Sequence, residues 1–358
     1  MTEAQQFRPP SVDYQGEEIE AFLVSHLANV RYLTGFTGSN GMVLATPHGA
    51  ILFTDPRYAI QSAQEASCKI SIVPRGGLIT AVTQYIRRRR MRRVGFEKTR
   101  LAYQHFSFLD QKLPTGVTLK PIDNVIERQR MVKTAPEIEA IRVSVLTNSR
   151  AFDRTLRKIK PGICECEVAA ELDYQSRKLG AEGPAFETIV ASGERTALPH
   201  ARPTKRRLGN DELLLIDMGA SQEGYASDMT RVLCLGKKSR KTEQMYRAVL
   251  EAQLAAIDAI RPGVTASGVD AAARTVLKRH GLDKNFTHST GHGLGLEIHE
   301  PPRLGKGDKT HLEAGMTITV EPGVYIEGFG GIRIEDTVAV TDTGCEVLTP
   351  TSKELVTL

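Results

Sequence analysis

The chain has 358 residues, of which 41% are hydrophobic and 25% charged, and a formal net charge of +5 at pH 7. This composition is ordinary for a soluble globular protein, and no apolar run approaches the roughly 18 residues that a membrane-spanning helix needs. At roughly 100–200 residues per domain, the length predicts two domains.

The N-terminal end and the cysteines bear on the cellular compartment. The first ten residues lack a basic segment followed by an apolar one, so no secretion signal is expected. The five cysteines are an odd number, and Cys164 and Cys166 are separated by one residue rather than by the two of a redox or zinc pair. We therefore expect reduced thiols in a cytoplasmic protein.

Residues from about Ala21 to Ile122 alternate between strand-like and helix-like segments. The strand-like segments are residues 21–25, 41–45 and 50–54, the last two joined by a turn at 46–49. Asp55 followed by Pro56 predicts the start of a helix. This part of the chain is therefore predicted to be an α/β domain.

A basic run from Arg87 to Arg93 closes a helix-like stretch of this domain and precedes a strand-like segment at Val94–Phe96. Cations in the last turn of a helix are favoured by the helix dipole. A nucleic-acid surface would need a recognised binding fold or stacking aromatic side chains beside the charges. We therefore predict a solvated helix end and no nucleic-acid partner.

The character of the sequence changes around residues 124–133. Thr134, followed by Pro136 and Glu137, predicts the start of a long helix. Further helices are expected over about residues 165–179, 241–260 and 267–280.

Apolar runs at 213–218 and 316–320 lie between these helix pairs. The C-terminal domain is therefore predicted to have helices packed on a mostly antiparallel sheet.

Two aspartates lie where the chain is expected to be buried. Asp217 follows the aliphatic run Leu213–Ile216, and a buried carboxylate without a cation is costly. Asp228 comes eleven residues later, and a turn at 220–224 would fold the chain into a hairpin that brings the two acids face to face. Two close carboxylates repel unless a cation lies between them. A hairpin with two solvated acids is the alternative.

His292 is flanked by Gly291 and Gly293, which let the backbone approach a site closely. The His-Glu-x-x-His pattern of a zinc protease is missing, and the glycine spacing does not fit a dinucleotide-binding loop. A lone histidine is more often structural than a ligand. However, His288 and His299 lie within the same twelve residues, which favours a functional site.

Two glutamates complete the candidate site. Glu321 follows the β-branched run 316–320 and precedes a Pro-Gly turn pair. Glu335 follows Ile332-Arg-Ile, and strand alternation would place it on the same face as Arg333, with which it could form a simple salt bridge.

The candidate metal ligands are therefore four carboxylates and one imidazole, namely Asp217, Asp228, His292, Glu321 and Glu335. Closed zinc sites prefer four ligands rich in nitrogen and sulfur, so this set is too acidic for a single zinc ion. It suits two divalent ions that share bridging carboxylates.

Short motifs around these residues resemble those of the pita-bread metallopeptidases, which include Xaa-Pro dipeptidase (prolidase), Xaa-Pro aminopeptidase and, more distantly, methionine aminopeptidase. Standing in family order are Asp-x-Gly at 217–219, Gly-Tyr-x-Ser-Asp-x-Thr-Arg at 224–231, Gly-His-Gly-x-Gly at 291–295, Glu-Pro-Gly at 321–323 and Arg-x-Glu-Asp at 333–336. Residues 32–36 and 54–58 look like the creatinase-type accessory domain of the family. The resemblance implies a creatinase-like α/β N-terminal domain at 1–126. It also implies a pita-bread catalytic domain at 127–358, an antiparallel sheet covered by helices.

The resemblance also implies how the metal ligands divide their work. Asp217 would bind one ion, His292 and Glu321 would bind the other, and Asp228 and Glu335 would bridge both. Two divalent ions are expected, of which manganese is the usual one in the family, with cobalt or zinc as further possibilities.

The resemblance implies a second group of residues around the substrate. His299 and His200 would lie near the substrate on opposite sides of the cleft, as active-site histidines. Arg333 would orient Glu335 and contact the substrate. Arg303 matches a position where prolidase-like members hold the C-terminal carboxylate of the substrate.

The activity implied is hydrolysis of the Xaa-Pro bond of a di- or oligopeptide by a hydroxide that bridges the two metals. Glu321 would carry the proton to the leaving prolyl nitrogen. A dipeptidase and an aminopeptidase remain open, and a homodimer is expected. Two further alternatives are a metal-free creatinase-like amidinohydrolase and a catalytically silent binding protein on the same fold, both of which typically depart from the family at the metal positions.

Overall fold

A β-hairpin at residues 41–54 confirms two of the expected strands. β2 (Gly41–Thr46) pairs antiparallel with β3 (Gly49–Thr54) in the computed structural model, which describes residues 7–358. The Asp55 side chain caps the short 3-10 helix Pro56–Tyr58 by accepting a hydrogen bond from the Arg57 amide. The regular helix α2 (Ala59–Glu65) follows it directly.

The first of two compact units, Met1–Arg130, is built on a six-stranded sheet with the order β4-β3-β2-β1-β5-β6. Its other strands are β1 (Ala21–Val24), β4 (Lys69–Ile72), β5 (Arg93–Glu97) and β6 (Thr118–Ile122). Its other helices are α1 (Leu27–Thr34), α3 (Leu78–Arg88), α4 (Tyr103–Lys112) and α5 (Val125–Met131), of which α5 ends one residue past the boundary of the unit. The basic run lies where it was expected, at the exposed end of α3 and before β5.

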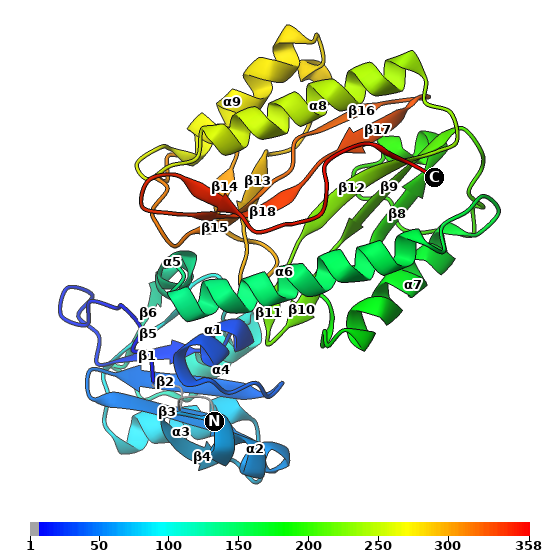
Figure 1. The fold of residues 1–358 in the computed structure, drawn as a ribbon. Coiled ribbons are helices and arrows are strands. Elements are labelled where there is room, and N and C mark those ends of the chain that lie inside the picture. The colour runs from blue at the N-terminus through cyan, green and yellow to red at the C-terminus, as the bar shows by residue number, and fades with distance from the viewer. Residues whose placement is uncertain (1–6) are drawn as a thin grey trace. The chain divides into compact units, whose positions relative to one another are not determined.

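The second unit, Met131–Leu358, carries its helices on antiparallel sheets (Figure 1). The helices are α6 (Ala135–Leu156), α7 (Glu165–Lys178), α8 (Arg240–Asp258) and α9 (Ala266–Arg279), close to the expected ranges. Thr134 caps α6, and the Glu137 carboxylate accepts a hydrogen bond from the Thr134 amide at 2.9 Å. The predicted fold class, an α/β unit followed by a helix-covered antiparallel one, is confirmed.

Two sheets of this unit carry most of the acids of interest. One has the order β20-β12-β9-β8, and the other has the order β14-β13-β15-β18-β19. Their strands are β8 (Ile189–Ser192), β9 (Glu212–Met218), β12 (Met229–Leu235), β13 (Gly291–Gly293), β14 (Glu300–Leu304), β15 (Thr317–Val320), β18 (Asp336–Val340), β19 (Cys345–Val347) and β20 (Val356–Thr357). Smaller sheets are formed by β7 (Gly183–Pro184), β10 (Ala220–Gln222) and β11 (Tyr225–Ala226), and by β16 (Gly323–Ile326) and β17 (Gly330–Arg333).

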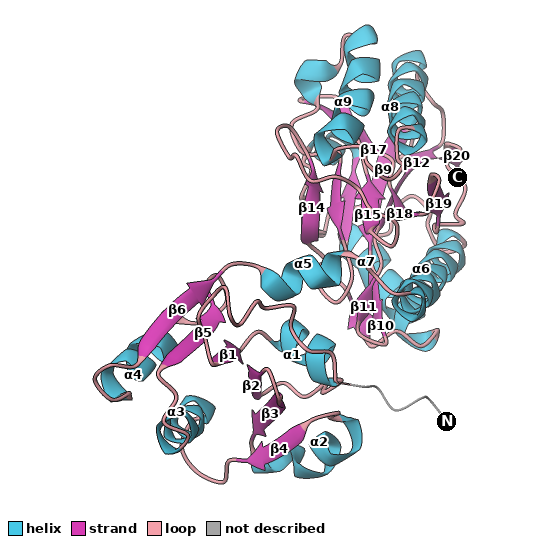
Figure 2. Ribbon diagram, turned by 90° about the vertical axis from the view of Figure 1, so that its left-hand side faces the viewer, coloured by secondary structure: helices cyan, strands magenta, loops and turns pink. Residues whose placement is uncertain are grey.

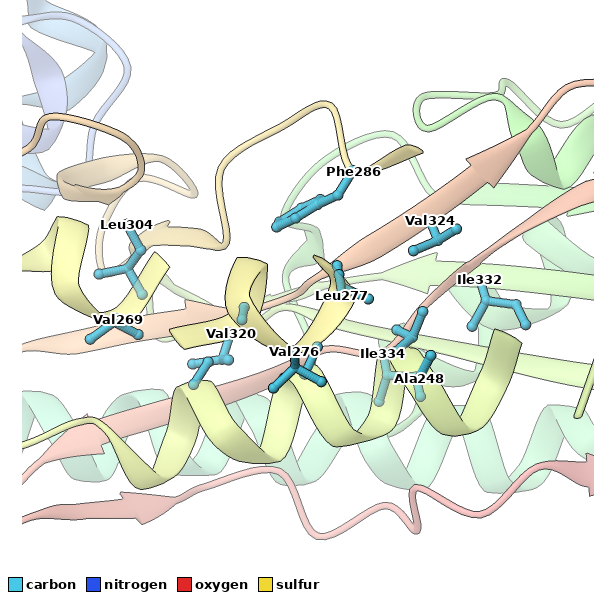
Figure 3. Packing of buried hydrophobic residues seen from close by; sticks show 14 of the residues in the cluster. Ala248, Val269, Val276, Leu277, Phe286, Leu304, Val320, Val324, Ile332 and Ile334 are labelled. Atoms are coloured by element: carbon cyan, nitrogen blue, oxygen red, sulfur yellow. The ribbon is translucent and has the colours of Figure 1, made fainter. Parts of the chain in front are cut away.

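The helices of this unit lie against its sheets (Figure 2). Each pair of helices has its own cluster of buried apolar side chains there. Figure 3 shows the layer under α8 and α9, where Ala248 and Val276 pack with Val320 and Ile334 of the strand side. Burial of such side chains stabilises the unit by roughly 1.5–3 kcal/mol each. The strand ends that carry the acids are thereby held on a rigid base.

Among residues 7–358, no helix combines the length and the apolar character that crossing a membrane requires. The five cysteines are all free thiols.

Candidate metal centre

Asp217 and Asp228 belong to neighbouring strands. Asp217 lies in β9 opposite Thr230 of β12, and Asp228 directly precedes β12. The hairpin between them turns at Glu223 and Gly224, whose φ angles of 52° and 77° suit a two-residue turn. The tip of this hairpin, β10 and β11, pairs into a separate three-stranded sheet, which sequence spacing did not indicate. Asp217 is 8% and Asp228 6% exposed, which excludes two solvated acids.

His292 and Glu321 are brought together by the pairing of β13 with β15. A Cβ at Gly291 would meet the backbone carbonyl of Thr319, so this close approach needs glycine. The Thr319 hydroxyl accepts a hydrogen bond from the His292 amide at 3.1 Å and donates one to the Glu321 carboxylate at 3.2 Å. One threonine therefore connects the backbone of His292 with the side chain of Glu321.

Glu335 lies in the break between β17 and β18 and is 1% exposed. Its amide donates to the carbonyl oxygen of Thr230 at 3.2 Å. Its carboxylate accepts a hydrogen bond from the Thr230 hydroxyl at 2.7 Å. Glu335 is thereby fixed to β12, the strand that follows Asp228.

These segments bring the candidate ligand atoms into one cluster. One ligand atom each of Asp228, His292 and Glu335 lies within 4.8 Å of the others. The Nε2 atom of His292 is 3.6 Å from Asp228 Oδ2 and 3.4 Å from Glu321 Oε1. Nδ1 of His292 lies 3.0 Å from the Gly293 carbonyl oxygen. Because a carbonyl only accepts, Nδ1 carries the proton and Nε2 presents its lone pair to the acids.

The electrostatics of the cluster favour the binding of a cation. Burial, and then the neighbouring acids, raise the pKa of Asp228 and that of Glu335 well above the usual range. Burial also raises the pKa of Glu321, to about 7, and lowers the pKa of His292. Among residues 7–358, Asp217 Oδ1 and Asp228 Oδ1 are buried without a hydrogen-bond partner. Oxygen-rich sets of this kind fit hard divalent cations such as Mn²⁺, and the neutral imidazole fits the same role.

Among residues 7–358, Arg333 pairs with Asp217 rather than forming the simple salt bridge with Glu335 that the sequence left open as an alternative. Its NH2 group donates to Asp217 Oδ2 at 2.5 Å. Its Nε donates at 3.0 Å to the Thr230 hydroxyl, which in turn donates to Glu335. The strand alternation that suggested a direct pair does not hold, because β17 ends at Arg333 and Glu335 lies beyond it.

A cavity of about 840 Å³ opens onto the cluster. Its lining includes all nine predicted site residues, namely Asp217, Asp228, His292, Glu321, Glu335, His200, His299, Arg303 and Arg333. The ring of His299 packs edge-on against His292, with centroids 4.4 Å apart. Burial, followed by the nearby His292 and His200, lowers the pKa of His299. The side chains of His200 and Arg303 are exposed on the cavity wall.

The sequence did not predict the hydrogen-bonded chain that links Arg333, Tyr325 and His288. The Tyr325 hydroxyl accepts a hydrogen bond from Arg333 at 2.7 Å and lies 2.9 Å from Nε2 of His288. Nδ1 of His288 donates to the Ser289 carbonyl, so Nε2 accepts from Tyr325. Burial lowers the pKa of His288 to about 4, which keeps it neutral. His288 carried a signal as one of three neighbouring histidines, whereas nothing in the sequence marks Tyr325.

Two family profiles cover most of the chain. Residues 139–342 match Metallopeptidase family M24. Residues 14–132 match the Creatinase/Prolidase N-terminal domain.

Similar proteins extend over nearly the whole length. An Xaa-Pro dipeptidase of Pyrococcus horikoshii is 37% identical over 94% of this chain and 95% of its own. The solved structure of an Xaa-Pro dipeptidase from Bacillus anthracis is 38% identical with a TM-score of 0.92, covering 96% of this chain and 97% of that one. The X-Pro aminopeptidase of Thermotoga maritima is 36% identical with a TM-score of 0.90, covering 95% of this chain and 98% of that one.

Proposed function

The chain belongs to metallopeptidase family M24 and is a hydrolase, and we propose that it is an exopeptidase that cleaves the Xaa-Pro peptide bond. The names of the similar dipeptidases and of the similar aminopeptidase support this substrate class. The observation that carries the proposal is the cluster of acids and one imidazole that lines a cavity.

We propose that this cluster holds two divalent cations, most simply Mn²⁺. Asp217 would hold one ion, His292 and Glu321 the other, and Asp228 and Glu335 both. The unpartnered oxygens of Asp217 and Asp228 and the proton-free Nε2 of His292 support this set. When bound, the ions would supply a nucleophile at neutral pH and polarise the scissile carbonyl.

The side chains of the cavity would carry the remaining steps. His299 and His200 can donate hydrogen bonds to the oxygen on which negative charge develops. The leaving prolyl nitrogen must gain a proton, and Glu321 is the proposed carrier because its carboxylate lines the cavity beside His292. The Xaa-Pro amide has no N–H group, so recognition has to come from the ring and from the two ends of the substrate.

Arg303 supports a dipeptide as the preferred substrate. Its side chain is exposed on the cavity wall, and among residues 7–358 its guanidinium has no ion-pair partner. The neighbouring Asp308 accepts hydrogen bonds from the Arg303 amide at 3.1 Å and from the Thr310 amide at 2.8 Å, one at each carboxylate oxygen. A free guanidinium suits the C-terminal carboxylate of a dipeptide, which it can hold by two parallel hydrogen bonds.

Xaa-Pro aminopeptidase activity is the second candidate. The cavity continues to the exposed ion pair of Arg202 and Glu187, 3.2 Å apart, where a longer peptide could lie.

An assay with one set of peptides distinguishes dipeptidase from aminopeptidase activity. Chelated protein resupplied with Mn²⁺ should hydrolyse Leu-Pro faster than Leu-Pro-Ala, and faster than the C-terminal amide of Leu-Pro. The amide is the matched control because it removes the carboxylate charge and keeps the shape. Equal turnover of dipeptide and tripeptide would favour the aminopeptidase, and no turnover of any Xaa-Pro peptide would remove the proposed function.

A further inference from the structure

Two motif residues beside the metal centre have no part in the proposed chemistry. Arg231 closes the motif that contains Asp228, and Asp336 follows Glu335 directly. The side chains of Arg231 and Asp336 form an ion pair at 2.8 Å with exposures of 3% and 0%. Replacing a buried ion pair with well-packed apolar side chains is often neutral or stabilising. The pair therefore needs an explanation other than stability alone.

The guanidinium of Arg231 is fully used. Its five N–H donors match five acceptors, three of which are carbonyl oxygens of other segments. The acceptors are the Thr230 carbonyl at 2.9 Å, the Glu335 carbonyl at 2.5 Å, the Asp336 carboxylate at 2.8 Å, the Thr351 carbonyl at 2.7 Å and the Ser352 carbonyl at 2.9 Å. Arg231 therefore ties the backbone of Glu335 to β12 on one side and to the C-terminal segment on the other.

The C-terminal segment places a second cationic side chain, Lys353, beside the Asp336 carboxylate. Lys353 Nζ lies 2.7 Å from Asp336 Oδ2. That oxygen also accepts a hydrogen bond from Gln253 at 2.8 Å. The Lys353 carbonyl accepts one from the Tyr246 hydroxyl at 2.9 Å, which fixes the segment to α8. Beyond it, β20 pairs with β12, as Figure 2 shows near the C-terminus.

We propose that the segment Thr351–Lys353 is a positioning element of the metal centre, with Lys353 as its principal side chain. Lys353 and Arg231 hold Asp336 from both sides, and Asp336 in turn fixes where the chain turns at Glu335. The segment thereby sets the distance between Glu335 and Asp228, on which shared metal binding depends. This inference rests on the proposed metal site and adds to it residues that contact neither metal nor substrate.

The effect should reach the metal ligands through position rather than through charge. Lys353 and Arg231 hold the same carboxylate through its two oxygens. Partners that orient metal ligands typically change metal affinity or activity by about 10–100-fold when they are replaced. Losing Lys353 should therefore weaken metal binding more than it weakens the fold, since Lys353 is 23% exposed and Arg231 still pairs with Asp336.

The test is a titration of the chelated full-length protein with Co²⁺, read by visible absorption and by calorimetry. Lys353→Met is expected to lower Co²⁺ affinity by about tenfold and to alter the absorption bands, with unfolding still cooperative. Lys353→Arg keeps the charge beside Asp336 and should bind Co²⁺ like the parent. Unchanged affinity and bands in Lys353→Met would overturn the inference.

A pair of truncations provides a second test that does not rely on one side chain. Removing residues 356–358 takes away β20 but leaves the contacts of Arg231, Asp336 and Lys353, so Co²⁺ binding should persist. Removing residues 351–358 should lower the affinity. Equal losses in both truncations would mean that the tail acts through general stability, and the inference would fail. If the parent itself bound no Co²⁺, the proposed function would fail before this inference was reached.

Discussion

Replacing Asp228 with asparagine should stabilise the chelated protein, because it removes one charge from a crowded group of buried acids. A ligand oxygen of Asp228 and one of Glu335 lie within 4.8 Å. Two unit charges about 5 Å apart repel by about 3 kcal/mol at an effective dielectric constant of about 20. Protonation, favoured by the raised pKa of both groups, already relieves part of this repulsion. We therefore expect a gain of about 1–2 kcal/mol.

Metal should reverse the order of the two proteins. At a Mn²⁺ concentration of about 100 times Kd, the parent gains about 2.7 kcal/mol and the variant, which lacks a shared ligand, gains little. A unit of this size shifts by about 2–4 °C per kcal/mol. In calorimetry, Asp228→Asn should therefore melt about 2–8 °C above the parent in chelator and below it in Mn²⁺.

A matched substitution separates charge relief from a general effect of asparagine. Asp336 is also buried, but it is paired with Arg231 and Lys353, so Asp336→Asn should lower the melting temperature in chelator. If Asp228→Asn in chelator melts at or below the parent, the acids are not under mutual repulsion and the reasoning is refuted.

Three further substitutions test other parts of the account. Arg303→Met should lower kcat/KM for Leu-Pro by about 10- to 100-fold, as expected from the loss of hydrogen bonds to a charged group. Turnover of the C-terminal amide of Leu-Pro should stay unchanged. Equal losses on the dipeptide and on its amide would show that Arg303 does not bind the carboxylate. Gly291→Ala should abolish Mn²⁺ binding in calorimetry, because its Cβ meets the Thr319 carbonyl; normal binding would show that the strands can part. Burial raises the pKa of Glu97, so the folded state binds more protons there than the unfolded state and loses stability as pH rises above about 4.5. Glu97→Gln should therefore make the free energy of unfolding, measured in urea, depend less on pH. An unchanged pH dependence would contradict this prediction.

Local sequence features were sufficient to predict the helices and strands around the acids. Thr134 with Glu137 marks the start of α6, and the aliphatic run before Asp217 marks β9. Such features depend on neighbours within a few residues, so they can be recognised without the fold.

Contacts between residues that are far apart in the sequence could not be predicted from such local features. Arg333 pairs with Asp217, 116 residues away, rather than with its neighbour Glu335, because β17 ends between the two. The roles of Tyr325 and Lys353 likewise depend on which segments meet in space, and neither residue lies in a recognisable motif. Periodicity gives the face of a strand, but it does not give the opposing side chain.

The most direct test of metal-dependent Xaa-Pro hydrolysis is the release of proline from Leu-Pro by chelated protein during a Mn²⁺ titration. We predict no release without metal and an increase that saturates at two ions per chain. Turnover that persists in chelator, or none after Mn²⁺ is restored, would contradict the account.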